Sequence, residues 1–245
     1  MRKIAEALKD QQDVFGDDLL GHIKPVPKII HEPVLQYKPS EENIVVKEST
    51  GTISEDFECS TDLEDLYSKI HNCKKCSLGN TRNKFVFGVG NPNADAMLIG
   101  EAPGADEDKL GEPFVGKAGK LLNDILKAIN FEREDVYIAN ILKCRPPNNR
   151  DPLPEEMVIC QKYLEKQIEI IKPKAILCLG RIAATTLLNK NVALGKIREE
   201  VHEFKGIKVM ATYHPAALLR NPSWKRGCWE DVQKFKKLVD ELNGK

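Results

Sequence analysis

The sequence has no hydrophobic run close to the roughly 20 residues that a membrane-spanning helix needs, which argues against an integral membrane protein. It also lacks the apolar core of a secretory leader, because its first ten residues carry charges. We therefore expect a soluble protein that stays in the reducing cytoplasm, where structural disulfides are rare. The seven cysteines of the chain then need another explanation.

Net charge is also absent, but the zero total hides an asymmetry along the chain. Residues 1–60 hold 7 Lys and Arg against 12 Asp and Glu, whereas residues 61–245 hold 30 against 25. We expect residues 1–60 to be an acidic, largely disordered N-terminal extension, and residues 61–245 to be the folded domain. Residues 1–15 have the pattern of a short amphipathic helix, which is either solvated or bound to an unidentified partner.

After residue 60, short apolar runs alternate with helical patterns. The runs typical of buried strands cover residues 96–100, 136–142, 174–180 and 207–213. The helical patterns cover residues 117–130, 154–171, 181–190 and 224–243. This alternation predicts an α/β fold, a three-layer α/β/α sandwich around a four-stranded, mainly parallel sheet.

In such a sheet, ligands bind beyond the carboxyl ends of the strands. That rule points to GEAPG after the first predicted strand, Asn140 in the second, Gly180 and Arg181 after the third, and His214 after the fourth.

Four cysteines surround the segment that holds most of these signals. Cys73 and Cys76 have the Cys-x2-Cys spacing that brings two thiolates to one metal centre. Cys144 follows an apolar run and Cys160 lies in a helical pattern, an irregular spread that fits an iron–sulfur cluster better than a zinc ribbon. The alternative is that Cys144 and Cys160 are ordinary core residues, since Cys160 lies on an apolar helical stripe.

The segment from Gly100 to Gly119 is rich in glycine between a strand and a helix, so its backbone can approach a phosphate or a flat ring. It has neither the GxGxxG spacing of a dinucleotide site nor the GK[ST] ending of a P-loop. Phe114 within it is either a stacking platform for a base or a core residue. Asn140 needs partners for a carboxamide in an apolar strand, which either a pyrimidine edge or nearby backbone supplies. A lone histidine such as His214 is usually structural.

Four motifs together resemble the family 4 uracil-DNA glycosylases. They are GEAPG at 100–104, PFVGKAG at 113–119, NILKCRPPNNR at 140–150 and HPAALLR at 214–220. The resemblance covers about residues 61–245 and leaves residues 1–60 unexplained. It implies a [4Fe-4S] cluster on Cys73, Cys76, Cys144 and Cys160, and we expect that cluster to be structural because glycosidic hydrolysis needs no electron transfer.

The resemblance implies that the protein hydrolyses the N-glycosidic bond of uracil in DNA and leaves an abasic site, the first step of base excision repair. The uracil must be flipped out of the stack into a pocket. By resemblance, Phe114 stacks on the base, Asn140 contacts its O4 and N3–H, and His214 donates to O2 as negative charge collects there. The backbone at Glu101 and Ala102 belongs to the same uracil pocket.

The residue that handles the attacking water is left open. Some relatives have an aspartate where this chain has Ala102, and alanine cannot act as a base. Glu101 and Glu107 are equal candidates for positioning or activating the water, although both are also compatible with solvated loop carboxylates. Glu107 is also a candidate for crowding the C5 position against a thymine methyl. Asn149 is a further candidate for holding the water or a phosphate.

Contacts to DNA phosphates are expected from cationic side chains, since neutralising phosphates releases counterions. Arg220 and Lys117 are the strongest candidates because they lie inside motifs. The other candidates are Arg145, Arg150, Arg181, Lys225 and Arg226. Leu218 or Leu219 is a candidate for wedging into the vacated base stack. We expect a monomer that acts on single- or double-stranded uracil-containing DNA.

Two rival functions fit part of this pattern. One is a non-catalytic or covalently trapping uracil-DNA binder on the same fold, which would carry a nucleophilic histidine in a loop after Asn140. Residues 143–156 contain no histidine, which argues against it. The other is an electron-transfer iron–sulfur protein that does not bind DNA.

Overall fold

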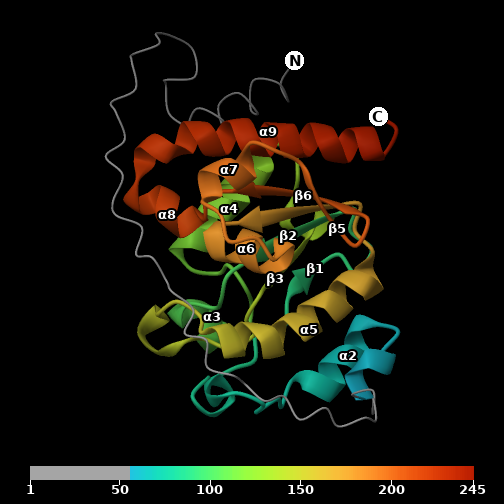
Figure 1. The fold of residues 1–245 in the computed structure, drawn as a ribbon, viewed down its shortest axis with the longest axis vertical. Helices are drawn as coiled ribbons and strands as arrows, with labels where there is room; N and C mark the ends of the chain where they lie inside the picture. The colour runs from blue at the N-terminus through green and yellow to red at the C-terminus, as the bar shows by residue number, and fades with distance from the viewer. Residues whose placement is uncertain (1–55) are drawn as a thin grey trace.

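The computed structural model describes residues 56–245, and a six-stranded sheet runs through their middle (Figure 1). The strand order is β1-β3-β2-β4-β6-β5. The strands are β1 (Val89–Gly90), β2 (Ala96–Gly100), β3 (Tyr137–Asn140), β4 (Ala175–Leu179), β5 (His202–Phe204) and β6 (Ile207–Thr212). The three-layer α/β/α architecture is confirmed, but the predicted number of four strands was wrong.

The two additional strands lie at the edges of the sheet. The inner strands β3, β2, β4 and β6 pair in parallel, and they are the four that the apolar runs predicted. The edge strands β1 and β5 pair antiparallel to β3 and β6. They have only two and three residues, which is too short to show an alternating pattern in the sequence.

Helices cover both faces of the sheet. They are α2 (Leu63–Ile70), α3 (Ala105–Leu110), α4 (Lys117–Ala128), α5 (Pro154–Ile171), α6 (Arg181–Leu188), α7 (Leu194–Arg198), α8 (Pro215–Arg220) and α9 (Lys225–Leu242). Short 3-10 turns connect some of them: η2 (Asp56–Cys59), η3 (Ser77–Asn80), η4 (Arg133–Asp135), η5 (Pro147–Asn149) and η6 (Pro222–Trp224).

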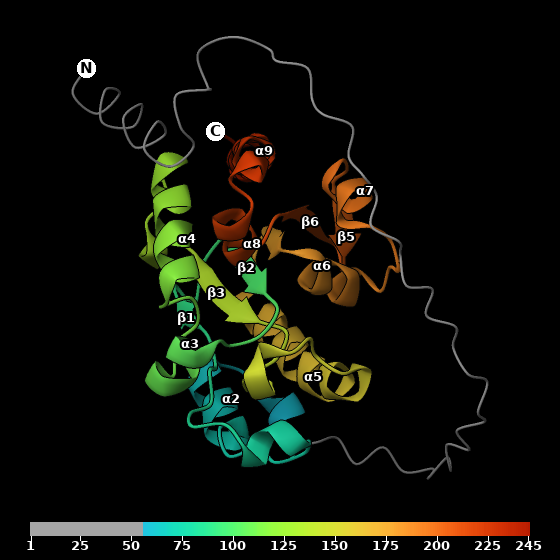
Figure 2. The same cartoon turned by 90° about the vertical axis from the view of Figure 1, so that its left-hand side faces the viewer.

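The alternation of side chains along the buried strands divides the core in two. On β2, Ala96 and Leu98 pack with the apolar sides of α4, α8 and α9. Met97 and Ile99 point to the other face and pack with α2, α5, α6 and α7. The two helical layers are visible on either side of the sheet in Figure 2. Because the inner strands are buried on both faces, their sequences are apolar throughout rather than alternating.

The strand order creates a place for a ligand at β2. The chain passes from β2 to β3 on one side and then crosses to β4 on the other, so β2 lies where the order reverses. In parallel sheets, a crevice opens at this point beyond the carboxyl ends of the strands. Gly100 pairs with Asn140 at those ends, which brings two of the predicted motifs together.

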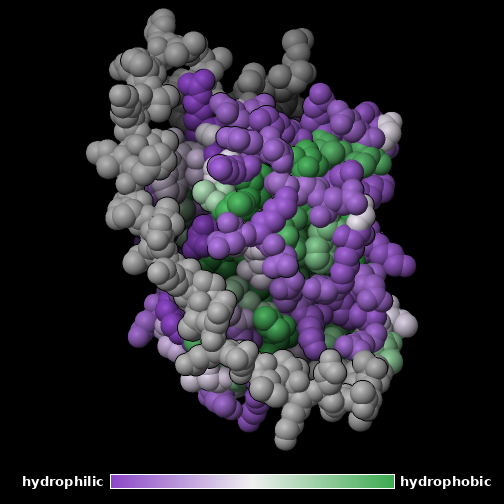
Figure 3. Space-filling view, in the orientation of Figure 1, coloured by the Kyte–Doolittle hydropathy of each residue, from purple (hydrophilic) through white to green (hydrophobic). Residues whose placement is uncertain are grey.

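The described part of the chain begins at η2, where Phe57 packs edge-on against Tyr163 of α5 with 4.8 Å between ring centroids. The predicted helix over residues 1–15 and residues 16–55 of the expected extension lie outside the described residues. Within the described range, we find no helix that is long and apolar enough to cross a membrane. The face shown in Figure 3 is mostly hydrophilic, with hydrophobic side chains gathered in a few patches.

Candidate functional site

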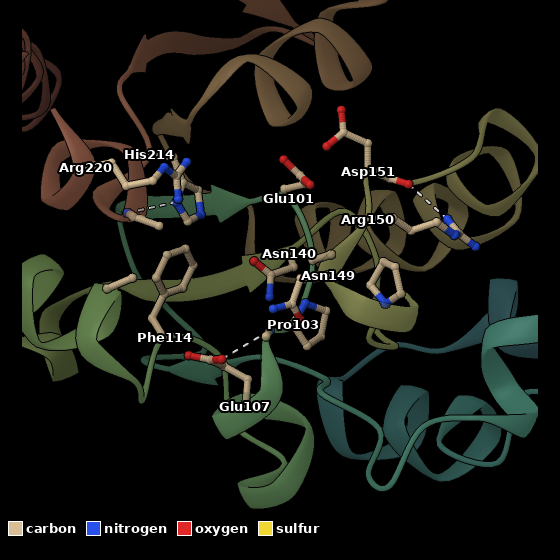
Figure 4. A pocket seen from close by; sticks show the side chains of 15 residues that line it. Glu101, Pro103, Glu107, Phe114, Asn140, Asn149, Arg150, Asp151, His214 and Arg220 are labelled. Atoms are coloured by element: carbon tan, nitrogen blue, oxygen red, sulfur yellow. Dashed lines mark hydrogen bonds between the residues drawn. The ribbon is translucent and has the colours of Figure 1, made fainter.

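A cavity of about 350 Å³ opens beyond the carboxyl ends of the inner strands. Figure 4 shows His214 and Phe114 on one side of it, Asn140 near the middle and Asp151 on the opposite side. The residues that line the cavity are Glu101, Ala102, Pro103, Gly104, Glu107, Phe114, Ala118, Asn140, Pro146, Asn149, Arg150, Asp151, His214, Ala216 and Arg220. Each of the motif segments noted in the sequence contributes to this wall.

Phe114 forms one face of the cavity. Its ring lies 5.5 Å from that of His214, centroid to centroid, with 32° between their planes. The backbone of Phe114 has the left-handed φ of 54°, which is unfavourable for a bulky residue and must be held by its surroundings. Arg133 supplies that hold, since its guanidinium donates to the carbonyl oxygens of Pro113 and Phe114.

Glycine at position 119 allows the tight turn that Phe114 begins. A Cβ built on Gly119 would lie 1.8 Å from the carbonyl oxygen of Phe114. Only glycine leaves room for the first turn of α4 to pack this closely. The PFVGKAG motif thus fixes the Phe114 ring at the wall of the cavity.

Asn140 ends β3 and presents its carboxamide to the cavity. Its side chain is 2 % exposed, and its Oδ1 has no hydrogen-bond partner in the structure. A buried polar atom without a partner is unfavourable by about 1–3 kcal/mol, so such an atom beside a cavity indicates a ligand that donates to it. A Cβ at Gly100 would lie 2.4 Å from this oxygen and 2.6 Å from the Phe114 ring, so glycine keeps the space open.

His214 caps α8, and its Nδ1 accepts a hydrogen bond from the Ala216 amide at 3.2 Å. An Nδ1 that accepts carries no proton, so in the neutral ring the proton is assigned to Nε2. Burial, and then the positive charge of Arg220, lower the pKa of His214 to about 4. At neutral pH the cavity therefore contains a neutral imidazole with a free Nε2–H donor.

Glu101 follows β2 directly and lines the same cavity. Burial, and then the negative charge of Asp151, raise the pKa of its carboxyl to about 7, while the positive charge of Arg181 acts to lower it. Arg181 lies 3.8 Å from the Asp151 carboxylate. A carboxyl with a pKa near 7 exchanges protons readily at physiological pH, which suits a general base.

The carboxylate of Glu107, in contrast, accepts hydrogen bonds from the backbone of the loop. Its Oε1 accepts from the amides of Val115 and Gly116 at 3.0 and 3.1 Å, and its Oε2 accepts from the Gly104 amide at 3.1 Å. The amide of Gly116, in the loop that the sequence suggested could approach a phosphate, is thus occupied by this carboxylate. Glu107 joins the GEAPG and PFVGKAG segments, so its main effect is to hold the cavity wall in place.

The PPNNR turn forms another part of the wall. Asn149 has a left-handed φ of 53°, and its Oδ1 accepts from Nε of Arg145 at 2.8 Å. Arg150 donates to both carboxylate oxygens of the buried Glu156 in α5 at 2.9 and 2.6 Å. Arg145 therefore stabilises the turn itself, and Arg150 holds the turn against α5.

Of the predicted cations, only Arg150 and Arg220 line the cavity. Arg220 lines it directly, whereas Lys117 is exposed at the start of α4. Of the two leucines considered for the base stack, Leu218 is buried in the core and Leu219 is exposed. Only Leu219 is therefore available for contact with DNA.

The four predicted cysteine ligands are brought together by three separate segments. Cys73 and Cys76 lie between α2 and η3, Cys144 follows β3, and Cys160 lies on the inner side of α5. Burial raises the pKa of Cys144 to about 11; Arg82 opposes this, and the charges of Cys76 and Cys73 add to it. Burial likewise raises the pKa of Cys160 to about 12, with a contribution from Cys144 and Cys73.

Hydrogen-bond donors surround these sulfurs. Cys144 Sγ accepts from the Arg82 guanidinium at 3.3 Å, and Cys160 Sγ accepts from the Lys143 amide at 3.2 Å. Cys73 Sγ accepts from the Tyr163 hydroxyl at 3.1 Å and from the Lys75 amide at 3.5 Å. Such donors stabilise thiolate charge, as around protein-bound iron–sulfur clusters.

Within residues 56–245, no three His, Cys, Asp or Glu side chains are grouped so as to hold a single metal ion. Four cysteine thiols with hydrogen-bond donors around them are the kind of ligand set that holds iron–sulfur clusters in proteins. The other cysteines are elsewhere: Cys178 and Cys228 are buried in the core and Cys59 is exposed.

The sequence missed several residues that build this site. Asp151 lines the cavity and directly follows the NNR motif. Its place next to this motif is the one sequence signal for it. Arg133 and Arg82 act through hydrogen bonds to distant loops, and nothing in their local sequence marks them. Lys143 is fully buried next to Cys144, and its amide donates to Cys160, although a lysine usually lies at the surface.

Comparison with known proteins agrees with this geometry. The family model of the uracil-DNA glycosylase superfamily matches residues 87–241. A type-4 uracil-DNA glycosylase of Archaeoglobus fulgidus is 47% identical over 191 residues, which are 75% of this chain and 94% of the relative. The type-4 enzymes of Sulfurisphaera tokodaii and Thermotoga maritima are 44% and 42% identical, each over 72% of this chain, and the matches cover 84% and 94% of those relatives. The chain therefore belongs to the type-4 uracil-DNA glycosylases of the uracil-DNA glycosylase superfamily.

Proposed function

We propose that this protein excises uracil from DNA by hydrolysing the N-glycosidic bond, which leaves an abasic site for base excision repair. The observation that carries the proposal is the unpaired Oδ1 of Asn140, which is buried beside a cavity that Phe114, His214 and the GEAPG loop also line. The family to which the chain belongs supports the same activity.

Recognition follows from the donors and acceptors of the base. Uracil offers an N3–H donor and an O4 acceptor side by side. The Oδ1 of Asn140 accepts from N3–H while its amide group donates to O4, and Phe114 stacks on the ring. Cytosine has an acceptor at N3 and a donor at C4, so each contact would become a mismatch. Sites built on such hydrogen bonds discriminate by about 10⁴–10⁵-fold.

The neutral tautomer of His214 suits the departure of the base. As the glycosidic bond breaks, negative charge collects on uracil O2 and positive charge on the sugar. Because the lowered pKa of His214 leaves its ring neutral at pH 7, the Nε2–H donates to O2 and stabilises that charge. The proton stays on Nε2, since a neutral imidazole is a very weak acid. Losing a donor of this type reduces the rate by about 10²–10³-fold.

The contacts of the two candidate carboxylates support different roles toward the attacking water. Glu107 accepts three backbone hydrogen bonds, so its lone pairs are largely used. Glu101 has a pKa raised to about 7 and lines the cavity, which suits it to position the water and take its proton. We assign water activation to Glu101 and loop positioning to Glu107, with Asn149 as a further contact for the water or a phosphate.

Cys73, Cys76, Cys144 and Cys160 would hold the [4Fe-4S] cluster. When bound, it supplies a covalent cross-link between three segments of the chain and no step of the hydrolysis. This fits the two buried thiols, whose raised pKa values keep them protonated unless iron displaces the protons. Arg220 beside the cavity and Lys117 at α4 contact the DNA phosphates, with Arg145, Arg150, Arg181, Lys225 and Arg226 available around them.

The test is excision from single-stranded and duplex oligonucleotides that carry one uracil, followed by alkaline cleavage of abasic sites. We expect strand scission with the wild-type protein and a loss of about 10²-fold or more with His214→Ala. His202→Ala is the matched control, because His202 lies on edge strand β5 and contacts the Ile197 carbonyl. Absence of scission with wild-type protein that contains iron would refute the proposed activity.

A further inference from the structure

Two large hydrophobic side chains are exposed on either side of the cavity-lining Arg220 in the sequence. Leu219 is 48 % exposed near the end of α8, and Trp224 is 42 % exposed at the end of η6. Between them in the sequence is Arg220, which lines the cavity. A tryptophan exposed to this extent is uncommon unless its surface is used, because burying an aromatic ring is strongly favourable.

The indole of Trp224 is held in a fixed orientation. It stacks on the Tyr213 ring with 5.0 Å between centroids and 24° between planes. The Arg198 guanidinium lies 3.9 Å from the centroid of the Tyr213 ring and donates to the hydroxyl of the same tyrosine at 2.6 Å. Arg198 is itself fixed by the buried carboxylate of Asp231 at 2.6 Å. The exposed ring is therefore the outer layer of a supported stack, which we call the Trp224 platform (Trp224, Tyr213 and Arg198).

The Trp224 platform is connected along the chain to two residues that line the cavity, His214 and Arg220. Tyr213 immediately precedes His214, so one backbone segment positions both the platform and the catalytic candidate. On the other side, the Asn221 amide donates to Ala217 in α8 and the Trp224 amide donates to Asn221. These bonds connect Trp224 to the helix that carries Arg220 by short backbone links.

Charge around the Trp224 platform favours a polyanion. Residues 219–226 contain Arg220, Lys225 and Arg226 and no carboxylate. Arg226 is 3.5 Å from Glu230, and both side chains are well exposed, so solvent screens that pair. An exposed aromatic ring with cations on either side is the combination that binds single-stranded nucleic acid.

We propose that the Trp224 platform stacks on an unpaired base next to the extruded uracil, so that the protein holds single-stranded uracil-containing DNA more tightly than duplex. The inference rests on the proposed function and extends it to the form of the substrate. In a duplex, the neighbouring base stays paired and its face is covered by adjacent base pairs. In a single strand, it is free to turn onto the indole.

The experiment measures binding of a single-stranded oligonucleotide that carries non-cleavable 2′-fluoro-deoxyuridine next to the fluorescent base 2-aminopurine. We expect Trp224→Ala to weaken binding about five-fold or more and to abolish quenching of 2-aminopurine, while Trp224→Phe retains most of both. Because stacking displaces no counterions, the dependence of affinity on salt should not change. Arg220→Gln, in contrast, should flatten that dependence.

Leu242→Ala is the matched control, since Leu242 is an exposed apolar residue at the far end of α9. Affinity and quenching for Trp224→Ala equal to wild type would overturn the platform, as would an equal loss on single strands and on the duplex. Melting curves of Trp224→Phe and Trp224→Ala separate a local loss from unfolding. Excision by the wild-type protein on the cleavable oligonucleotide is measured in parallel, so failure of the activity is distinguished from failure of the platform.

Discussion

At the scale of single residues, the cavity depends on the absence of one methyl group. A Cβ on Gly100 would meet Asn140 Oδ1 at 2.4 Å and the Phe114 ring at 2.6 Å, so one or both of these side chains would have to shift. We expect Gly100→Ala to displace the carboxamide, to raise KM for uracil-containing DNA and to lower kcat/KM by about 10²-fold. Steady-state kinetics on a uracil oligonucleotide measure this.

Gly195→Ala is the control for Gly100→Ala. A Cβ on Gly195 has no neighbour within 4 Å, so this variant should have wild-type kinetics. Wild-type KM in Gly100→Ala would show that the amide of Asn140 does not contact the base.

The raised pKa of Glu101 predicts the pH dependence of the reaction. If its carboxylate takes a proton from water, the rate rises with pH and levels off above a pKa of about 7. Glu101→Gln should remove this acidic limb and lower the single-turnover rate by about 10²–10⁴-fold. Single-turnover rates between about pH 5 and 9 decide the point, and an unchanged limb in Glu101→Gln would assign it to another group.

Two neighbouring charges provide a sign test of the same assignment. The negative charge of Asp151 raises the pKa of Glu101, so Asp151→Asn should move the acidic limb to lower pH. The positive charge of Arg181 lowers that pKa, so Arg181→Gln should move the limb to higher pH. Shifts in the same direction for both variants would contradict the electrostatic explanation.

At the scale of elements, Lys143 connects the end of β3 to α5. Its ammonium is buried and donates to the Asn140 carbonyl at 3.0 Å and to Oε1 of Gln167 at 2.6 Å. Gln167 in turn donates to the Phe87 carbonyl at 3.0 Å. The strand end that presents the Asn140 carboxamide is thus fixed from behind.

Lys143→Met removes this support. Two buried acceptors lose a donor, so we expect the free energy of unfolding to fall by about 1–3 kcal/mol and KM for uracil-containing DNA to rise. Urea unfolding and steady-state kinetics measure the two effects. Lys166→Met is the control, because Lys166 on the same α5 pairs with the exposed Glu169. A stability loss with unchanged KM would leave Lys143 with a purely structural role.

The inner elements were predictable because long buried segments carry strong patterns. The run AILCL of β4 and the stripe of α4 needed no tertiary information. The edge strands β1 and β5 were missed because pairing with a neighbour, rather than local sequence, makes them strands.

The same distinction holds within the site. Asn140 and His214 were predicted from their places at strand ends and Phe114 from its glycine-rich loop, and the structure brings all three to one cavity. The hydrogen bonds from Arg133 to the Phe114 loop were not predictable, because they depend on two segments meeting in the fold. Motifs therefore identified residues that line the cavity, and missed residues that position them.

At the scale of the whole molecule, the four cysteines come from three segments that pack into one core. Cys73 and Cys76 belong to the segment before the sheet, Cys144 follows β3, and Cys160 is on α5. A cluster held by all four thiols would cross-link these segments, and because Cys144 lies four residues after Asn140 it would also bear on the cavity. Removing one of the proposed ligands should therefore affect stability and iron content together.

Cys76→Ala tests this directly. We expect loss of iron and of the cluster's visible absorbance, together with a fall in Tm of at least about 5 °C, since 1 kcal/mol corresponds to about 2–4 °C in a domain of this size. Cys59→Ala is the matched control, because Cys59 is exposed and outside the cysteine group. Iron loss with an unchanged Tm would refute a structural role for the cluster. Full iron content in Cys76→Ala would show that Cys76 is not a ligand, since the remaining thiols would then hold the metal without it.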